Sequence, residues 1–334
     1  MNIHAYASTT AGSAFEPFDY TLGDLAHDEV DIAVETCGLC HSDLSMKNND
    51  WEITAYPFIG GHEVVGKVIG KGEHVSHLEI GQRVGLGWYS RSCGLCAPCL
   101  NGDQNLCVLA EGTIVNRHGG FADKVRAQAL WCTPIPEALD PAAVGPLFCG
   151  GITAFNPIVQ NGITALDRVA VVGIGGLGHL ALQFLSAWGC KVTAISTSDS
   201  KLDEAKALGA DHFLDARDPE ALKSAAGKFK MILVTVNVPL DWDLYMTMLD
   251  RRGKLHIVGA VPSVTSTAFP LIEQQKCIGG SPLGSPGLVL QMLDFCARKE
   301  IAPVTQRYPM REINTAFDDL KAGKARYRLV LENG

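Results

Sequence analysis

The first third of the chain alternates short apolar runs with glycines. The runs are rich in β-branched residues or alternate between apolar and polar positions, and the glycines between them permit tight turns. Closely spaced strands with turn glycines are typical of a β-barrel or β-sandwich. We therefore predict a β-rich N-terminal part with strands at 30–35, 63–69, 83–88 and 121–126.

The pattern changes near residue 141, where Pro141 and the alanines after it predict the start of a helix. Buried runs then alternate with helical periodicity, which is typical of a parallel sheet covered by helices on both faces. The predicted strands are 169–172, 191–196, 212–214, 231–236 and 254–258. The predicted helices are 177–188, 201–208 with Ser200 as its cap, 220–226, 243–251 and 288–298. The tail predicts a helix over 313–320 and then a strand over 327–331 that returns to the first part.

Composition and charge narrow the functional classes. The 334 residues favour about two domains, and 36 acidic against 28 basic residues give a net charge of −8. That balance argues against a nucleic-acid partner and disfavours an anionic membrane surface. Residues 169–190 lack charge and are long enough to cross a bilayer, but their glycines favour a strand, a turn and a helix instead. The N-terminus has no signal-peptide pattern, so we expect a cytoplasmic protein with no membrane partner.

Four of the eleven cysteines form a local cluster: Cys93, Cys96, Cys99 and Cys107. An odd number of cysteines without a secretory signal argues against a disulfide framework. The C-x2-C-x2-C-x7-C spacing allows four thiolates to close a tetrahedral zinc site, and such a closed site is structural. An iron–sulfur cluster would use similar ligands.

A glycine-rich turn follows the strand predicted at 169–172 and opens the helix predicted at 177–188. Gly173, Gly175, Gly176 and Gly178, with Leu177 between the last two, fit the G-x-G-x-x-G pattern. In this context the glycines let a pyrophosphate approach the N-terminus of the helix. The alternative is a turn that only packs the helix on the strand.

The residues at the end of the strand predicted at 191–196 determine whether NAD or NADP is bound. NAD sites carry Asp or Glu at this position, whereas this chain has Ser196 and Thr197, with Lys201 nearby. Hydroxyl donors and a cation suit a 2′-phosphate, so we predict NADP(H) as the cofactor. Asp199 is the competing feature, because its carboxylate could accept from a ribose hydroxyl or begin the next helix instead.

Three further metal-binding side chains lie far apart in the sequence: Cys40, His62 and Cys149. Taken singly, each has an ordinary interpretation: Cys37 and Cys40 as a redox pair, His62 as a packed histidine and Cys149 as a small buried residue. Taken together, two thiolates and one imidazole can hold a catalytic zinc with its fourth position open.

These motifs resemble the zinc-dependent medium-chain alcohol dehydrogenases, and in particular their cinnamyl-alcohol-dehydrogenase-like branch with its NADP-dependent aldehyde reductases. The resemblance runs along the chain through CGLCHSDL, GGHEVVG, the four-cysteine lobe, PLFCGGIT, GIGGLGH and KARYRLVLE. It implies an α/β fold with a GroES-like catalytic domain at 1–150, to which 287–334 returns, and a Rossmann domain at 151–286. It also implies an active site in the cleft between the domains, and a homodimer.

The resemblance further implies roles around two zinc ions. Cys93, Cys96, Cys99 and Cys107 would hold the structural zinc, and Cys40, His62 and Cys149 the catalytic one. Glu63 would lie beside the catalytic metal, Asp43 would orient the histidine ligand, and Ser42 would exchange the substrate proton. Many relatives carry His three residues after that hydroxyl, where this chain has Ser45.

Cofactor contacts follow from the same resemblance. His41 takes the place of a residue near the cofactor pyrophosphate, and Thr153 that of a residue near the nicotinamide. Ser196, Thr197 and Lys201 match the contacts to the 2′-phosphate in NADP-dependent members.

The expected activity is hydride transfer between NADP(H) and a primary alcohol or aldehyde substrate. Candidate substrate-pocket walls are Trp51, Trp88 and Phe58, each of which could equally be core. The alternatives are an NAD-dependent polyol or secondary-alcohol dehydrogenase, a catalytically silent NADP-binding sensor, and a zinc storage protein, which the glycine motif disfavours. No Tyr-x-x-x-Lys, G-x-S-x-G or P-loop pattern supports another enzyme class.

Overall fold

The computed structural model describes residues 1–333, and the chain folds into two compact units. The first unit contains residues 1–152 together with the chain from residue 284 onward, and the second contains residues 153–283. Within residues 1–333, every helix is too short or too polar to span a membrane.

The first unit is mainly β-structure. Its strands are β1 (Asn2–Ser8), β2 (Phe15–Thr21), β3 (Glu29–Leu39), β4 (Val64–Lys71), β5 (Arg83–Leu86), β6 (Tyr89–Arg91), β7 (Glu111–Gly112), β8 (Lys124–Gln128), β9 (Cys132–Pro134), β16 (Thr305–Pro309) and β17 (Arg328–Glu332). Its helices and 3-10 turns are α1 (His41–Asn48), α2 (Ala97–Leu100), η1 (Gln104–Leu106), η2 (Ala129–Trp131), η3 (Gly145–Phe148), α9 (Pro286–Lys299), η5 (Met310–Glu312) and α10 (Ile313–Lys321). The predicted β-rich N-terminal part is confirmed.

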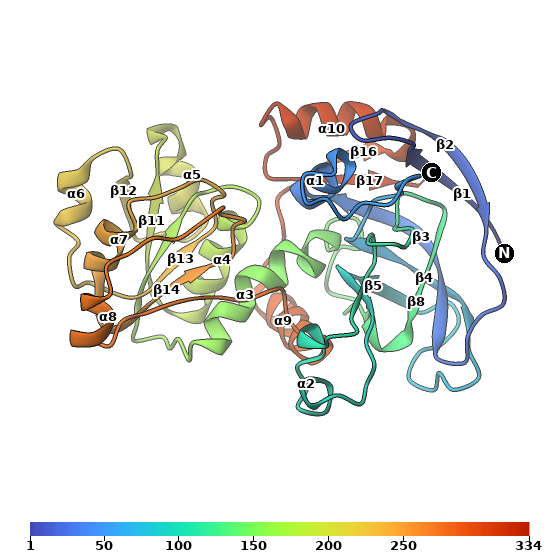
Figure 1. The fold of residues 1–334 in the computed structure, drawn as a ribbon, viewed down its shortest axis with the longest axis horizontal. Coiled ribbons are helices and arrows are strands. Elements are labelled where there is room, and N and C mark those ends of the chain that lie inside the picture. The colour runs from blue at the N-terminus through green and yellow to red at the C-terminus, as the bar shows by residue number, and fades with distance from the viewer. Residues whose placement is uncertain (334) are drawn as a thin grey trace. The chain divides into compact units, whose positions relative to one another are not determined.

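Strand β3 is the centre of the first unit's seven-stranded sheet, where it pairs with β4, β8 and β17. The pairing with β17 is antiparallel and brings Leu331 opposite Cys37, so the tail returns to the first unit as predicted. Helix α10 lies beside β16 and β17 (Figure 1). Its apolar side packs Phe317 against Phe15 and Phe121 in the core.

The second unit is a parallel sheet with helices. Its strands are β10 (Arg168–Val172), β11 (Lys191–Ser196), β12 (His212–Asp215), β13 (Phe229–Val234), β14 (Leu249–Ile257) and β15 (Cys277–Gly280). Its helices and 3-10 turn are α3 (Gly150–Gln160), which crosses from the first unit, α4 (Gly178–Trp188), η4 (Asp199–Lys201), α5 (Leu202–Ala207), α6 (Pro219–Lys223), α7 (Trp242–Met248) and α8 (Phe269–Glu273).

All pairings in this sheet are parallel, and the spatial order is β12-β11-β10-β13-β14-β15. This is the 3-2-1-4-5-6 order of the Rossmann fold, which confirms the predicted fold class. Residues 169–190 form β10, a glycine turn and α4, as their glycines predicted, and no membrane helix.

Three local predictions were wrong. The helix expected from Pro141 does not form until α3, because Gly145 and Pro146 interrupt the Ala-rich run and leave only the 3-10 turn η3. The helix expected over 243–251 ends at Met248, because Leu249 pairs with Phe229 as the start of β14. Ser200 does not cap α5: it lies inside η4, and its hydroxyl contacts Ser198 at 2.7 Å.

Candidate active site and metal centres

The dispersed ligand set converges in the first unit. Cys40 follows β3 as the N-cap of α1, His62 lies just before β4, and Cys149 directly follows η3 as its C-cap. The Cys149 Sγ lies 3.2 Å from His62 Nε2 and 4.0 Å from Cys40 Sγ. In a tetrahedral zinc site, bonds of about 2.0–2.3 Å place neighbouring ligand atoms about 3.5–3.8 Å apart. The three side chains therefore fit one zinc ion.

Asp43 contacts the His62 ring and the backbone amide of Cys40. Its carboxylate is fully buried, and one oxygen accepts from the Gly61 amide at 2.8 Å and lies 3.1 Å from His62 Nδ1. The other oxygen accepts from the Cys40 amide at 3.0 Å. A carboxylate on Nδ1 leaves Nε2 free to bind a metal and fixes the ring orientation. This is the geometry that the orienting role predicted for Asp43 requires.

The charges in this cluster favour ligand ionisation on one thiol. Burial alone would lower the pKa of His62, but the Asp43 carboxylate and Cys40 outweigh it and raise that pKa well above its usual range. A hydrogen bond from the Cys149 thiol, helped by the Arg328 cation, lowers the pKa of Cys40 well below its usual range. The same hydrogen bond raises the pKa of Cys149. Two thiolates this close therefore need a cation between them.

Glu63 lies beside the three ligands and pairs with Arg328 of β17. Both side chains are buried, and Glu63 Oε2 and Arg328 Nε have no hydrogen-bond partner among residues 1–333. Burial raises the pKa of Glu63 to about 7, against the opposing effect of the Arg328 cation. The two orphaned polar atoms fit a site that binds further polar groups. Arg328 was missed by the sequence analysis, although it lies within the KARYRLVLE motif.

Ser42 and two tryptophans lie around the same cluster. The Ser42 hydroxyl is 3.8 Å from Cys40 Sγ. The Trp88 ring meets the His62 ring edge to face at 5.0 Å, and Trp51 meets Trp88 at 6.0 Å. Phe58, by contrast, is 2% exposed within the core of the first unit, so of the two interpretations left open for Phe58 the structure supports the core.

The four-cysteine lobe forms a second thiol cluster in the first unit, and its four ligand atoms lie within 4.8 Å of one another. Cys93 Sγ lies 4.0 Å from Cys99 Sγ and 3.5 Å from Cys107 Sγ. These spacings also fit a tetrahedral zinc site. Backbone amides that point at the sulfur lower the pKa of Cys93 to about 6, whereas burial and neighbouring thiols raise that of Cys99 to about 12. Four thiols at this spacing therefore need a cation before all can ionise.

The glycine motif opens the second unit's helix α4 as predicted. Gly173 has a φ of +92°, and a Cβ there would meet Val236 Cγ1 at 2.5 Å. A Cβ on Gly178 would meet the Gly173 carbonyl oxygen at 1.9 Å, so the helix packs directly on the turn. A Cβ on Gly175 would meet nothing within 4 Å. The backbone at Gly175 is therefore open to a ligand, as a pyrophosphate site needs.

The end of β11 carries the predicted hydroxyls and lysine. Ser196 is buried, Thr197 is exposed, and the Lys201 ammonium donates to the Ile174 carbonyl of the glycine turn. Asp199 pairs instead with Arg217 at 2.8 Å. The carboxylate that competes for the ribose is therefore neutralised by a cation.

Arg217 was not singled out from the sequence. It follows β12, and the parallel register of β11 with β12 sets Ser196 beside Asp215, two residues before Arg217. The carboxyl ends of neighbouring parallel strands meet at one edge of a sheet. That rule could have placed Arg217 beside Ser196 and Thr197. Of the remaining predicted residues, His41 is exposed at the start of α1, and Thr153 is half-buried in α3.

Comparison with known proteins matches both units to family models. Residues 26–137 match the alcohol dehydrogenase GroES-like domain, and residues 176–298 match the zinc-binding dehydrogenase domain. The chain is 50% identical to an aldehyde reductase of Synechocystis over 99% of both chains, and 34% identical to the Escherichia coli aldehyde reductase YahK over 100% of this chain and 99% of that protein.

Solved structures show the same likeness. A cinnamyl alcohol dehydrogenase of Sorghum bicolor has a TM-score of 0.94 at 32% identity, and a Helicobacter pylori enzyme of that type, solved with NADP(H), has a TM-score of 0.91 at 27% identity. Each match covers 99% of this chain and 98% of the other. The chain belongs to the zinc-dependent medium-chain alcohol dehydrogenase family.

Proposed function

We propose that this protein is a zinc-dependent alcohol dehydrogenase that works as an NADP(H)-dependent reductase of aldehydes. The observation that carries the proposal is the convergence of Cys40, His62 and Cys149 in front of a buried Asp43. Three protein ligands leave a fourth position for a substrate oxygen, as catalytic zinc sites do. The aldehyde reductases among its relatives support the substrate class.

Each residue of this site has a distinct task. The zinc, when bound by Cys40, His62 and Cys149, supplies a Lewis acid that polarises the substrate oxygen. Asp43 keeps the imidazole in its metal-binding orientation. Ser42, beside Cys40, passes a proton to the substrate oxygen on reduction and accepts it on oxidation.

The surroundings of the site restrict what can enter. Trp88 and Trp51 form an apolar wall next to His62, which suits the carbon chain or ring of an aldehyde. Glu63 and Arg328 form a buried ion pair beside the ligands, and the Arg328 cation offsets part of the negative charge of the thiolates.

The second thiol cluster has a structural task in this proposal. Its four cysteines, Cys93, Cys96, Cys99 and Cys107, hold a second zinc that fixes the shape of the loop.

We assign the first unit as the catalytic domain and the second as the cofactor domain. Free cysteines throughout the chain suit a reducing compartment, and we propose a cytoplasmic location.

The second unit supplies most of the proposed cofactor contacts. The open backbone at Gly175 receives the pyrophosphate, together with Gly173, Gly176, Leu177 and Gly178. At the end of β11, the 2′-phosphate is received by Ser196, Thr197 and Lys201, and we add Arg217, whose guanidinium is held there by Asp199 and Asp215. We also keep His41 for the pyrophosphate and Thr153 for the nicotinamide.

The proposal is tested by following NADPH oxidation across aliphatic and aromatic aldehydes. Charge-assisted bonds to a phosphate are worth roughly 1.5–3 kcal/mol each, so one or two of them favour NADPH over NADH by roughly 10-fold to 10⁴-fold in kcat/KM. Preferred turnover of mannitol with NAD would instead support a polyol dehydrogenase. Mannitol is tested because another relative is named a probable mannitol dehydrogenase. NADPH binding with no turnover of any substrate would indicate a sensor.

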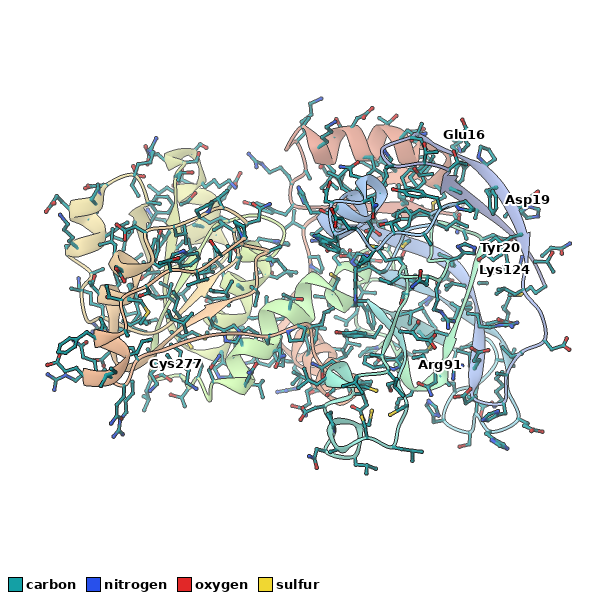
Figure 2. All side chains as sticks on the ribbon, viewed as in Figure 1. Glu16, Asp19, Tyr20, Arg91, Lys124 and Cys277 are labelled. Carbon is teal, nitrogen blue, oxygen red and sulfur yellow. The ribbon has the colours of Figure 1, made fainter. Side chains whose placement is uncertain are left out.

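We also propose a homodimer formed through the edge of the second unit's sheet. Strand β15 is an edge strand, its residues Cys277, Gly279 and Gly280 are exposed, and Figure 2 labels Cys277 there. The preceding α8 exposes Phe269 (68%) and Ile272 (74%). An exposed edge with apolar neighbours favours pairing with a second copy. Light scattering should show a dimer that Ile272→Asp converts to monomer, whereas Leu166→Asp, at a 95% exposed position of the same unit, should leave it intact.

A further inference from the structure

A pocket of about 340 Å³ lies in the second unit at the amino ends of its parallel strands. Arg168 begins β10, Lys191 begins β11, His212 begins β12 and Lys228 immediately precedes β13, and all four side chains line the pocket. The glycine motif lies at the opposite ends of these strands. Since β10 has five residues at about 3.3 Å each, the two ends are roughly 15 Å apart. The pocket is therefore separate from the proposed cofactor contacts.

The strand register forces the positive charges together. Arg168 pairs with Lys191 across neighbouring parallel strands, and Thr193 pairs with His212. Paired positions share a face of the sheet, and so do positions two residues apart along one strand. Arg168, Lys191 and His212 therefore project from the same face. Arg168 and Lys191 carry like charges that repel each other, and a bound anion would offset that repulsion.

The cations here have no acidic partner in the structure. Within residues 1–333, the side chains of Arg168, Lys191 and Lys228 form no ion pair and no hydrogen bond to protein. Several arginines elsewhere are held by carboxylates, as Arg83 is by Glu35 and Arg126 is by Asp31. The distinguishing feature is that three unpaired cations line one pocket, in a chain with 36 acidic and 28 basic residues.

Two carboxylates lie close by in the sequence, but each is occupied by the backbone. Asp167 accepts from the Thr164 amide at 2.7 Å and from its hydroxyl at 2.9 Å. Asp211 accepts from the Val192 amide at 2.7 Å. Both carboxylates reduce the local positive potential, but neither pairs with the cations of the pocket. Three full cations against two engaged carboxylates leave room for an added anion.

We propose that this pocket binds a small polyanion, one that carries two or more phosphate or carboxylate charges. The planar guanidinium of Arg168 suits bidentate contact with either group, and the ammonium groups of Lys191 and Lys228 add charge from two sides. Phe213 also lines the pocket and gives the carbon skeleton of such a ligand an apolar surface. The volume suits a metabolite rather than a macromolecule. This binding site is independent of the hydride-transfer chemistry.

Equilibrium dialysis of the zinc-loaded, full-length protein tests the proposal, with NADP⁺ present at saturation to fill the cofactor site. The two probes are 3-phosphoglycerate and tricarballylate, which separate a phosphate ester from a tricarboxylate. We expect one equivalent of at least one probe to bind per chain, and the stronger probe identifies the preferred anion. Binding that disappears when NADP⁺ is present would assign the anion to the cofactor site and overturn the proposal.

Matched variants locate the site. Because a charge-assisted contact is worth about a factor of ten or more in affinity, Arg168→Gln and Lys191→Gln should each weaken binding at least about tenfold. Lys206→Gln removes the same charge from an exposed position on α5 of the same unit and should change affinity by less than about twofold. Equal weakening in all three variants, or no saturable binding in the parent protein, would overturn the proposal. Aldehyde reduction should be unchanged in all three, which shows that they are folded.

Discussion

The two thiol clusters of the first unit use the same chemistry on different length scales. The lobe takes Cys93, Cys96, Cys99 and Cys107 from one short loop, whereas Cys40 and Cys149 in the other cluster are separated by 109 residues. A local cluster needs only its own turns to form, so its metal organises the loop. A dispersed cluster forms only after the sheet around β3 has folded. The metal of the local cluster stabilises its loop, whereas the dispersed cluster is positioned by the folded sheet.

Their electrostatic surroundings differ in the same way. In the lobe, backbone amides such as those of Leu95 and Cys96 stabilise the thiolate of Cys93. In the dispersed cluster, buried side chains do this work: Asp43 holds His62, and Arg328 offsets negative charge. Backbone support cannot be removed by one substitution, whereas side-chain support can. The dispersed site should therefore lose function through single changes that leave the fold intact.

The largest expected effect is on turnover in Cys40→Ala. Removal of a ligand from the proposed catalytic zinc removes a Lewis acid worth several kcal/mol, so kcat/KM should fall by about a thousandfold or more. Zinc content should fall from two ions per chain toward one, while circular dichroism and Tm remain close to those of the parent. Full activity with one zinc per chain would contradict the assignment of two sites.

Cys96→Ala should give the reverse pattern. The lobe should lose its metal and part of its order, because the binding energy of a structural zinc is folding energy. A loss of about 2–3 kcal/mol corresponds to a decrease in Tm of roughly 5–10 °C in a protein of this size class. Differential scanning calorimetry and the specific activity of the soluble fraction measure both aspects. An unchanged Tm together with lost turnover would show that the lobe is catalytic.

Sequence reasoning identified most of both clusters, for different reasons. The lobe was readable from spacing alone, because its ligands are local. Cys40, His62 and Cys149 became a site only when three weak signals were combined with a family resemblance. The pairing of Glu63 with Arg328 could not be predicted, because it joins residues 265 positions apart through the pairing of β17 with β3.

The same distinction explains the errors in the fold. The strands β10 to β13 and the helices α4 to α6 of the second unit have strong periodicity and were located within a few residues, whereas α8 and β15 were not predicted. The region 249–251 has helical propensity, but its pairing with β13 makes it a strand, because tertiary contacts override local preference. The pairing of β1 with β2 was not predicted, since many of their positions are polar or half-buried.

Ser42→Ala tests whether a proton leaves the dispersed site through a side chain. General acid–base groups contribute about 10²–10⁴ in rate, so we expect kcat to fall by about a hundredfold with NADPH affinity nearly unchanged. Ser45→Ala, also half-buried in α1, is the matched control and should retain most activity. Equal rates in Ser42→Ala and the parent would show that the proton takes another route.

Asp43→Asn should have a smaller effect, because the asparagine still fills the space behind His62. A partner that orients a metal ligand typically contributes 10–100-fold in metal affinity or activity. We expect the affinity of the dispersed site for zinc to fall within that range, while the four-cysteine lobe retains its metal. Competition with a chelator of known affinity separates the two sites. Simultaneous loss of both zinc ions would mean that Asp43 supports the whole unit rather than one ligand set.

The smallest effect is expected for Cys37→Ala. This variant tests whether the C-x2-C spacing alone makes Cys37 a zinc ligand. Cys37 and Cys40 have the same C-x2-C spacing as Cys93 and Cys96, but Cys37 is fully buried in the core on β3, and burial raises the pKa of its thiol well above the usual range. Removal of one methylene-sized group from a core costs about 0.5–1.5 kcal/mol. Zinc content should therefore remain at two per chain, and kcat/KM should stay within about threefold of the parent. Tm should fall by a few degrees, at roughly 2–4 °C per kcal/mol.

The matched control is Cys132→Ala, which removes another buried thiol of the same unit and should behave alike. Loss of one zinc in Cys37→Ala but not in Cys132→Ala would make Cys37 a ligand, and loss of activity with both zinc ions retained would revive a redox pair with Cys40.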